Sequence, residues 1–234
     1  MCRHGRIFYL LIRDFMMKKL NVSFLMFFFI SVSLCLPLAG FSRDFTVEDA
    51  LKGLEKKYTG KSFKAHFHQT TNLAALDIND TSSGKVWFSH PGKMRWQYIL
   101  PRPYDFITNG QTIWFYQPRE NQVSIGNAGD FFKAGAGGTF LSDFSQVREN
   151  YSSRLKTFSV NDYTLELTPK KAVPEVALIE IKADRQSHEI YQVITQNIHS
   201  DTTTFDFTDT RFVSPDPDLF EFIIPEGISV IEMD

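Results

Sequence analysis

From residue 62 onward, apolar and polar side chains alternate along most of the chain. A period of two is typical of β-strands with one buried face, because successive side chains point to opposite faces of a sheet. The alternating runs are short, and turn-forming Gly, Pro, Asn and Asp separate them. They predict about ten or eleven strands, at 62–69, 85–88, 93–98, 112–116, 122–126, 154–160, 163–168, 176–183, 189–197, 203–212 and 219–224.

One helix is predicted ahead of the strands, from Thr46 to Tyr58. Its apolar residues recur at helical spacing, which indicates that one face is buried. Thr46 can cap the first turn, and Thr59-Gly60 ends the helix. The residues that share the apolar face are Val47, Ala50, Leu51, Leu54 and Tyr58.

The run from Gly84 to Tyr98 predicts two aromatic-rich strands joined by a tight turn at Pro91-Gly92. One face of each strand is large and apolar, whereas the other carries Lys, Arg and Gln. Such a sheet packs its inner face on something apolar, or encloses it. Asn109-Gly110 is a strong signal for a second hairpin.

The segment from Gly126 to Gly138 is rich in Gly and Ala and leads into a short amphipathic helix. A Gly-rich approach to such a helix suits a lid that moves. An ordinary helix that plugs the end of a barrel fits the pattern equally well. The apolar face of this helix carries Phe140, Leu141, Phe144 and Val147.

Residues 1–42 have the pattern of a secretory signal peptide. Lys18-Lys19 precede an apolar stretch from Val22 to Leu38, and small residues follow at Ala39-Gly40. Met16 or Met17 is an alternative start. The alternative to cleavage is an uncleaved membrane anchor, because the apolar stretch is about long enough to span a bilayer.

Removal of residues 1–42 would leave a single domain, 43–234, without cysteine, since Cys2 and Cys35 both lie in the leader. Cys35 is too far upstream of the small-residue exit to serve as a lipidation site. An exported domain of this kind has no disulfides, so its core alone must hold it together. No internal domain boundary is evident in its 192 residues.

The charge of the mature chain is mildly acidic. Five of the 25 basic residues and one of the 27 acidic residues lie in the leader, which leaves 20 basic against 26 acidic side chains, a net charge of about −6. This balance argues against a nucleic-acid binder, which needs a basic footprint. It also argues against tight electrostatic attachment to an anionic membrane.

Sequence motifs for catalysis are absent. The chain has no G-x-S-x-G elbow and no phosphate-binding glycine loop, and the mature part has no cysteine nucleophile. His66 and His68 share one strand face, as in some metal sites, but a third ligand would have to come from His90 or His199. Outward polar positions explain the pair more simply, so no metal, cofactor or enzymatic activity is expected.

Aromatic residues are abundant: the mature chain keeps 16 Phe and all three Trp. Such side chains can line a ligand cavity or fill a large β-domain core.

Several ordered blocks resemble the LolA family, the periplasmic carriers of lipoproteins in Gram-negative bacteria. The resemblance covers most of the mature chain. The matching positions are Phe63, Phe67 and Gln69; Gly84, Trp87, Phe88, Pro91, Lys93, Met94, Arg95, Trp96, Tyr98 and Pro101; Asn109 to Pro118; Gln122-Val123; Leu167 to Lys170; and Phe220, Phe222, Pro225, Gly227, Ile228 and Val230.

The resemblance implies a mainly β fold with helices: a half-open antiparallel β-barrel over one apolar cavity, closed by a helical lid. It implies a monomeric periplasmic shuttle, which takes acylated lipoproteins from an inner-membrane ABC transporter and delivers them to an outer-membrane receptor. The expected lid residues are the four on the amphipathic helix. Those expected to line the acyl-chain cavity are Phe63, Phe67, Phe88, Met94, Trp96, Tyr98 and Phe115.

The chain departs from the family at one position. The family commonly carries Arg immediately before the proline of the central turn, where it is tied to lid closure and cargo handover. Here that latch position is His90. His is neutral over much of the range above pH 6.5 and makes fewer hydrogen bonds than Arg. Either His90 performs a weaker version of the same role, or this chain closes its lid differently.

The alternative to a lipoprotein shuttle is a related β-fold that binds another lipid or glycolipid, or that acts as an envelope-stress sensor. The family's outer-membrane receptor shares the fold but is itself lipidated, and the missing cleavage-site cysteine argues against that assignment.

Overall fold

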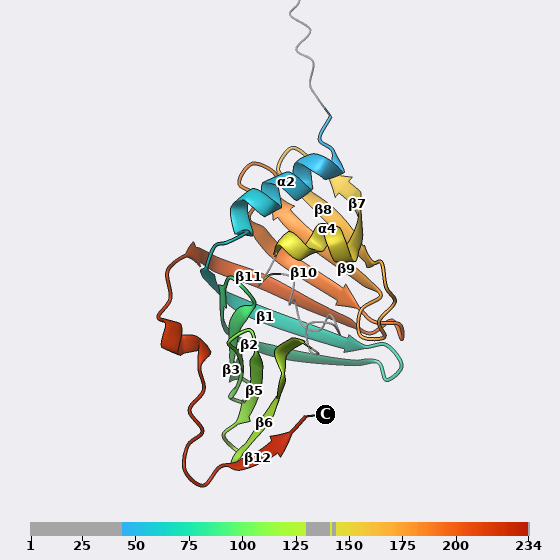
Figure 1. Ribbon diagram of the computed structural model, residues 1–234. Helices are drawn as coiled ribbons and strands as arrows, with labels where there is room; N and C mark the ends of the chain where they lie inside the picture. Colours follow the sequence, from blue (N-terminus) through green and yellow to red (C-terminus); the bar gives the residue numbers. More distant parts are fainter. Residues whose placement is uncertain (1–43, 130–140, 142–143, 234) are drawn as a thin grey trace, which may run out of the picture. The chain divides into compact units, whose positions relative to one another are not determined.

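The computed structural model divides the chain into two units, Met1–Asp44 and Phe45–Asp234. It describes residues 44–129, 141 and 144–233 (Figure 1). The predicted signal peptide, and the alternative anchor within it, therefore lie outside the described residues. No helix within the described residues has the length and apolar character needed to cross a membrane.

The second unit is mainly β. Its strands are β1 (Phe63–Leu73), β2 (Ile78–Ser89), β3 (Lys93–Leu100), β4 (Tyr104–Thr108), β5 (Thr112–Gln117), β6 (Gln122–Asn127), β7 (Tyr151–Phe158), β8 (Asp162–Pro169), β9 (Leu178–Asp184), β10 (Ile190–Gln196), β11 (Thr202–Phe212) and β12 (Ser229–Glu232). The described helices are α2 (Val47–Tyr58), α4 (Val147–Asn150) and the 3-10 turns η2 (Phe144–Gln146) and η3 (Pro217–Phe220).

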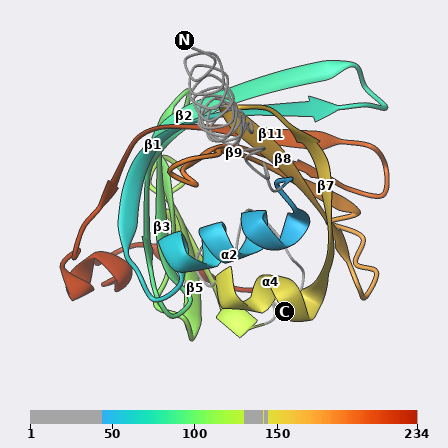
Figure 2. The same cartoon turned by 90° about the horizontal axis from the view of Figure 1, so that it is seen from above.

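All the described strands form one sheet, in the order β12-β6-β5-β4-β3-β2-β1-β11-β10-β9-β8-β7. Its neighbours run antiparallel except for β12 and β6, which are parallel. β12 and β7 are the two edges, so the sheet is not closed into a barrel. Seen from above, the sheet curves around α2 and α4, which lie on its concave side (Figure 2). The predicted fold is confirmed in its coarse form, a mainly β domain with an open sheet.

Helix α2 forms as its sequence predicts. The Thr46 hydroxyl accepts a hydrogen bond from the Asp49 backbone N–H, and the Asp49 carboxylate accepts one from the Thr46 N–H, which completes a capping box. The residues that it buries against the sheet are Ala50, Leu51, Leu54 and Tyr58. The Tyr58 hydroxyl, in turn, accepts a hydrogen bond from the Ile190 N–H at 2.8 Å, so the end of the helix is tied to β10.

Two predictions about the strands were wrong. Strand β4 was not expected, and residues 219–224 do not form a strand. Asp216 instead caps the 3-10 turn η3, in which Pro217 occupies the start and Phe220 is buried. The last strand is β12, which lies further along the chain and pairs with β6.

The segment that includes η3 covers the outer face of β4 to β6. Ile107, Trp114 and Val123 form a second, smaller core there, against which Phe222 and Ile228 pack. Arg95 on β3 donates a hydrogen bond to the Leu219 carbonyl at 3.4 Å and forms an ion pair with Asp105. The conspicuous aromatic residues near the end of the chain therefore stabilise the sheet from outside.

Candidate functional site

The inner, concave face of the sheet carries a continuous row of aromatic rings. Phe63 on β1 stacks on Phe88 of β2 with ring centroids 4.8 Å apart, and Phe88 meets Trp96 of β3 edge-on at 5.7 Å. Phe67 then contacts Trp96 and Tyr98, each at 4.9 Å. The row thus crosses three neighbouring strands.

The row continues toward β5. Tyr98 stacks on Tyr104 at 4.1 Å, and Tyr104 meets Phe115 edge-on at 5.2 Å. Met94 is fully buried in the same core. The structure therefore brings the seven residues predicted to line a cavity onto one face. Phe115 lies at the end of the row and is only partly buried.

The β2–β3 hairpin separates its two faces as predicted. Val86 and Phe88 point inward and are buried, whereas Lys85 is exposed on the outer face. Gly84 allows the strands to approach: a Cβ at this position would lie 2.0 Å from the Gln97 carbonyl oxygen and 2.9 Å from the Phe67 ring. The inner row of rings therefore depends on a glycine at residue 84.

The described residues of the predicted lid lie against this row. Leu141, Phe144 and Val147 are all buried in the main core. Phe144 stacks beside Tyr58 of α2 with centroids 6.2 Å apart. Phe140 lies outside the described residues.

Among the described residues, side chains beneath the helices leave little room around Tyr58 and Phe63. A pocket bordered by Tyr58, Phe63, Leu141, Ile190, Phe207 and Thr210 has a volume of about 10 Å³. That is about the least room in which one water molecule fits. Among the described residues, most of the predicted lining packs into the main core, and an apolar cavity stays a prediction.

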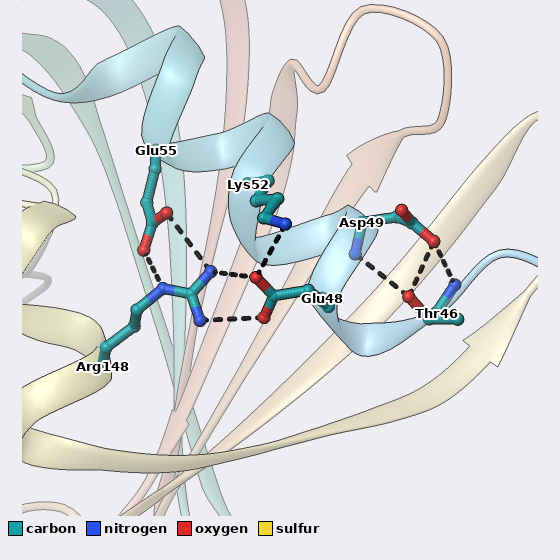
Figure 3. Close-up of polar contacts among 6 residues, drawn as sticks. All are labelled: Thr46, Glu48, Asp49, Lys52, Glu55 and Arg148. Carbon is teal, nitrogen blue, oxygen red and sulfur yellow. Dashed lines mark hydrogen bonds and ion pairs between the residues drawn. The ribbon is translucent and has the colours of Figure 1, made fainter.

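An ion-pair cluster joins α2 to α4 (Figure 3). Arg148 on α4 donates to Glu48 at 2.9 and 3.2 Å and also to both carboxylate oxygens of Glu55. Lys52 pairs with Glu48 from the next turn at 3.3 Å. Hydrogen bonds from Arg148, together with those from Lys52, hold the pKa of Glu48 below its ordinary value. We call Glu48, Glu55 and Arg148 the clasp.

The clasp is exposed to solvent, and exposed ion pairs are weak and screened by salt. It links two elements that enter the sheet at different places: α2 leads into β1, and α4 leads directly into β7. The clasp can therefore hold the two helices together across the inner face. Its ion pairs can also separate at a small cost in free energy.

A polar contact lies within the aromatic row. Burial raises the pKa of Tyr98 far above its usual range, so its phenol stays protonated. It donates a hydrogen bond to the Gln69 side chain at 2.7 Å. Gln69 in turn donates to Thr71 at 3.1 Å. The inner face therefore changes along β1 from aromatic to polar.

The histidines take the positions expected of polar strand and turn residues. His66 and His68 are exposed on the outer face of β1, and the described residues contain no His, Cys, Asp or Glu cluster that could hold a metal ion. His90 is exposed in the turn between β2 and β3. The turn that contains His90 lies beside the turn at Gly110. A Cβ added at Gly110 would lie 3.3 Å from the Pro91 carbonyl oxygen. The latch role of His90 stays a prediction.

The clasp and one member of the aromatic row, Tyr104, were not predicted from the sequence. Glu48 and Glu55 are two helical turns apart, so they share one face of α2, and this spacing is a usable signal. Their partner Arg148 is distant in sequence, and no local pattern connects it with them. Tyr104 was missed because strand β4 was not predicted.

Comparison with known proteins decides the family. A family model described as "Outer membrane lipoprotein carrier protein LolA" matches residues 59–223. The chain belongs to the LolA family. The match spans β1 through η3, the part of the chain that builds the concave face and most of the sheet.

Several relatives described as outer-membrane lipoprotein carrier proteins match most of the chain. The outer-membrane lipoprotein carrier protein of Serratia proteamaculans is 26% identical over 201 residues, which cover 84% of this chain and 94% of the relative. That of Erwinia tasmaniensis is 27% identical over 220 residues, covering 92% and 98%. An uncharacterised conserved protein from Thermus thermophilus has a similar fold, with a TM-score of 0.53 at 10% identity, covering 80% of this chain and 98% of that one.

Membership of a carrier family agrees with the expectation that the chain is not an enzyme. A LolA-type carrier role follows in outline.

Proposed function

We propose that this protein is a periplasmic chaperone that binds the acyl chains of lipoproteins released from the inner membrane and carries them to an outer-membrane receptor. The observation that carries the proposal is the aromatic row on the concave face, covered by α2 and α4. The proposed acyl-binding residues are Phe63, Phe67, Phe88, Met94, Trp96, Tyr98 and Phe115. The covering residues are Phe140, Leu141, Phe144 and Val147.

The close packing of the aromatic rings is suited to a carrier that must be stable without cargo as well as with it. An empty apolar cavity in water would expose aromatic surface, whereas here the rings pack on one another. Cargo must therefore displace α2 and α4 and replace ring–ring contacts with ring–acyl contacts. The free energy of those lost contacts subtracts from the binding energy.

That subtraction is useful, because full burial of the cargo would be irreversible. Burying one 16-carbon acyl chain is worth roughly 12 kcal/mol at about 0.8 kcal/mol per methylene. Three such chains would exceed the practical ceiling of about 18–21 kcal/mol for non-covalent affinity. We infer that the chains are buried in part, and that recovery of the packed core favours release to the receptor.

Mass spectrometry of the molecules that co-purify with the protein from the periplasm tests the proposal. We expect acylated N-terminal peptides of lipoproteins, lost when α2 and α4 are covalently tied together. Free glycolipid in place of acylated peptides would contradict lipoprotein carriage and favour a carrier of another lipid.

A further inference from the structure

A second pocket lies on the opposite, outer face of the sheet. It has a volume of about 160 Å³ and is open to solvent. Three neighbouring strands, β11, β1 and β2, supply its walls. Its principal side chains are Lys64, His66, Lys85, Trp87, Asp209 and Arg211. The proposed acyl-binding residues all point to the other side of the sheet, so this pocket is separate from that site.

An irregularity in the sheet shapes the pocket. Lys64 pairs with Arg211 and His66 pairs with Thr208, so β11 has one more residue than β1 between these two pairs. Asp209 sits at this bulge with a φ of 58°, in the left-handed region. Bulges redirect side chains and locally increase twist. Here the bulge places Asp209 and Arg211 on the same face, where Arg211 donates to Asp209 at 2.9 Å.

Positive charge converges on the pocket. Lys64 lies directly opposite Arg211, and Lys85 lies directly opposite His66. Like charges in directly opposed positions destabilise a sheet. Lys64, Lys85 and Arg211 meet a single carboxylate, Asp209, which leaves two positive charges uncompensated even with His66 neutral.

The pKa of the Asp209 carboxylate agrees with this geometry. A hydrogen bond from Arg211 lowers the pKa of Asp209, and the charges of His66 and Lys64 lower it further. Among the described residues, Lys64 and Lys85 form no ion pair of their own. The concentration of cations is notable in a mature chain whose net charge is about −6.

The size and chemistry of the pocket restrict its occupant. Sites for drug-sized ligands have volumes of about 300–1,000 Å³, so this one suits a small group rather than an acyl chain. Lysine ammonium groups and an arginine guanidinium are the usual partners of phosphate oxygens. Trp87 adds a flat wall against which an apolar part next to the charge can lie.

We propose that this outer pocket binds one phosphate-type anion. Lys64 and Lys85 supply the free ammonium groups, Arg211 supplies the guanidinium nitrogen not engaged by Asp209, and Trp87 forms the wall. The phosphate is either a free ion or the headgroup of an anionic lipid. The acidic balance of the whole chain opposes a broad membrane contact, so recognition is confined to a single group.

Titration of the exported, purified protein with inorganic phosphate at low ionic strength tests the proposal, followed by NMR of the backbone amides. We expect saturable shifts at residues 64–66, 85–87 and 209–211. The variant carrying both Lys64→Gln and Lys85→Gln lacks the two ammonium groups proposed to contact the phosphate. Because each such solvent-exposed contact is weak, the variant should bind phosphate about tenfold more weakly. Lys182→Gln, an outward-facing charge on β9 away from the pocket, is the matched control and should bind as the wild type does.

Absence of saturable shifts in the wild type, or equal binding by the Lys64→Gln/Lys85→Gln variant, would overturn the proposal.

A second experiment, with lipid vesicles, identifies the source of the anion. Co-sedimentation with vesicles of phosphatidylcholine and phosphatidylglycerol that needs Lys64 and Lys85 identifies a lipid headgroup. Phosphate binding without vesicle binding identifies the free ion, and both results support an anion site. Acyl loading should be unchanged in the variant, so this test stands or fails independently of the carrier function.

Discussion

A cross-link that ties α2 to α4 is expected to abolish acyl-chain binding. Leu141, Phe144 and Val147 are buried in the aromatic core beneath the helices, so we expect the helices to part before an acyl chain can enter. Glu55 and Arg148 face each other across the gap between them (Figure 3). Replacing both residues by cysteine and bridging them with a short bis-maleimide would join the helix that leads into β1 to the helix that leads into β7. Binding of an acylated lipoprotein would be measured before and after bridging.

The matched control is a second ion pair that is treated in the same way. Lys156 on β7 forms an ion pair with Glu180 on β9. Both residues therefore belong to strands of the sheet and not to α2 or α4. Lys156→Cys with Glu180→Cys, bridged by the same reagent, should bind cargo normally. The unbridged Glu55→Cys/Arg148→Cys protein should bind no more slowly than the wild type, because it lacks the clasp. Undiminished binding by the bridged helices would show that they do not need to separate.

Gly84→Ala is expected to destabilise the fold by about 3 kcal/mol or more. The added methyl group would lie 2.0 Å from the Gln97 carbonyl oxygen, which belongs to the backbone of β3 and cannot rotate away. The β2–β3 pairing would have to open, and the Phe67 ring would have to leave its place over residue 84. Urea unfolding followed by tryptophan fluorescence measures the change, because Trp96 lies in the disturbed row.

Gly60→Ala provides the comparison. A methyl group at residue 60 would have nothing within 4 Å, but the φ of +70° at this position is unfavourable for alanine. The cost of this substitution should be about 1 to 2 kcal/mol, from backbone strain alone. Equal losses in the two variants would mean that Gly84 matters only for its backbone freedom and not for the close approach of the strands.

The regular parts of the fold could be predicted because their signals are local. Alternation along β1 to β3 identified the inner aromatic face, and the spacing of Leu51 and Leu54 identified the buried face of α2. Ordered family blocks then connected these strands to a known carrier fold. Which side chains face the core can be predicted from a short stretch of sequence, because the direction of each side chain follows from the periodicity of its own strand or helix.

The remaining features depend on contacts between distant segments. β12 is exposed and pairs in parallel with β6, about a hundred residues earlier, so its sequence has no buried-face alternation to reveal it. Phe220 reads as part of a strand, but Pro217 and the Asp216 cap bend the chain into a 3-10 turn. The volume of the interior could not be predicted either, because the same aromatic residues can line a cavity or fill it.

The central claim is that acyl chains bind on the concave face of the sheet, and photo-cross-linking tests it most directly. Tyr98 points to that face, whereas its neighbour Gln97 points outward. A benzophenone side chain would be placed at residue 98 or, as the control, at residue 97, and the protein would be loaded with an acylated lipoprotein and irradiated. Our account predicts an adduct on the acyl chain from residue 98 and none from residue 97. Acyl adducts from residue 97 alone, or equally from both residues, would contradict it.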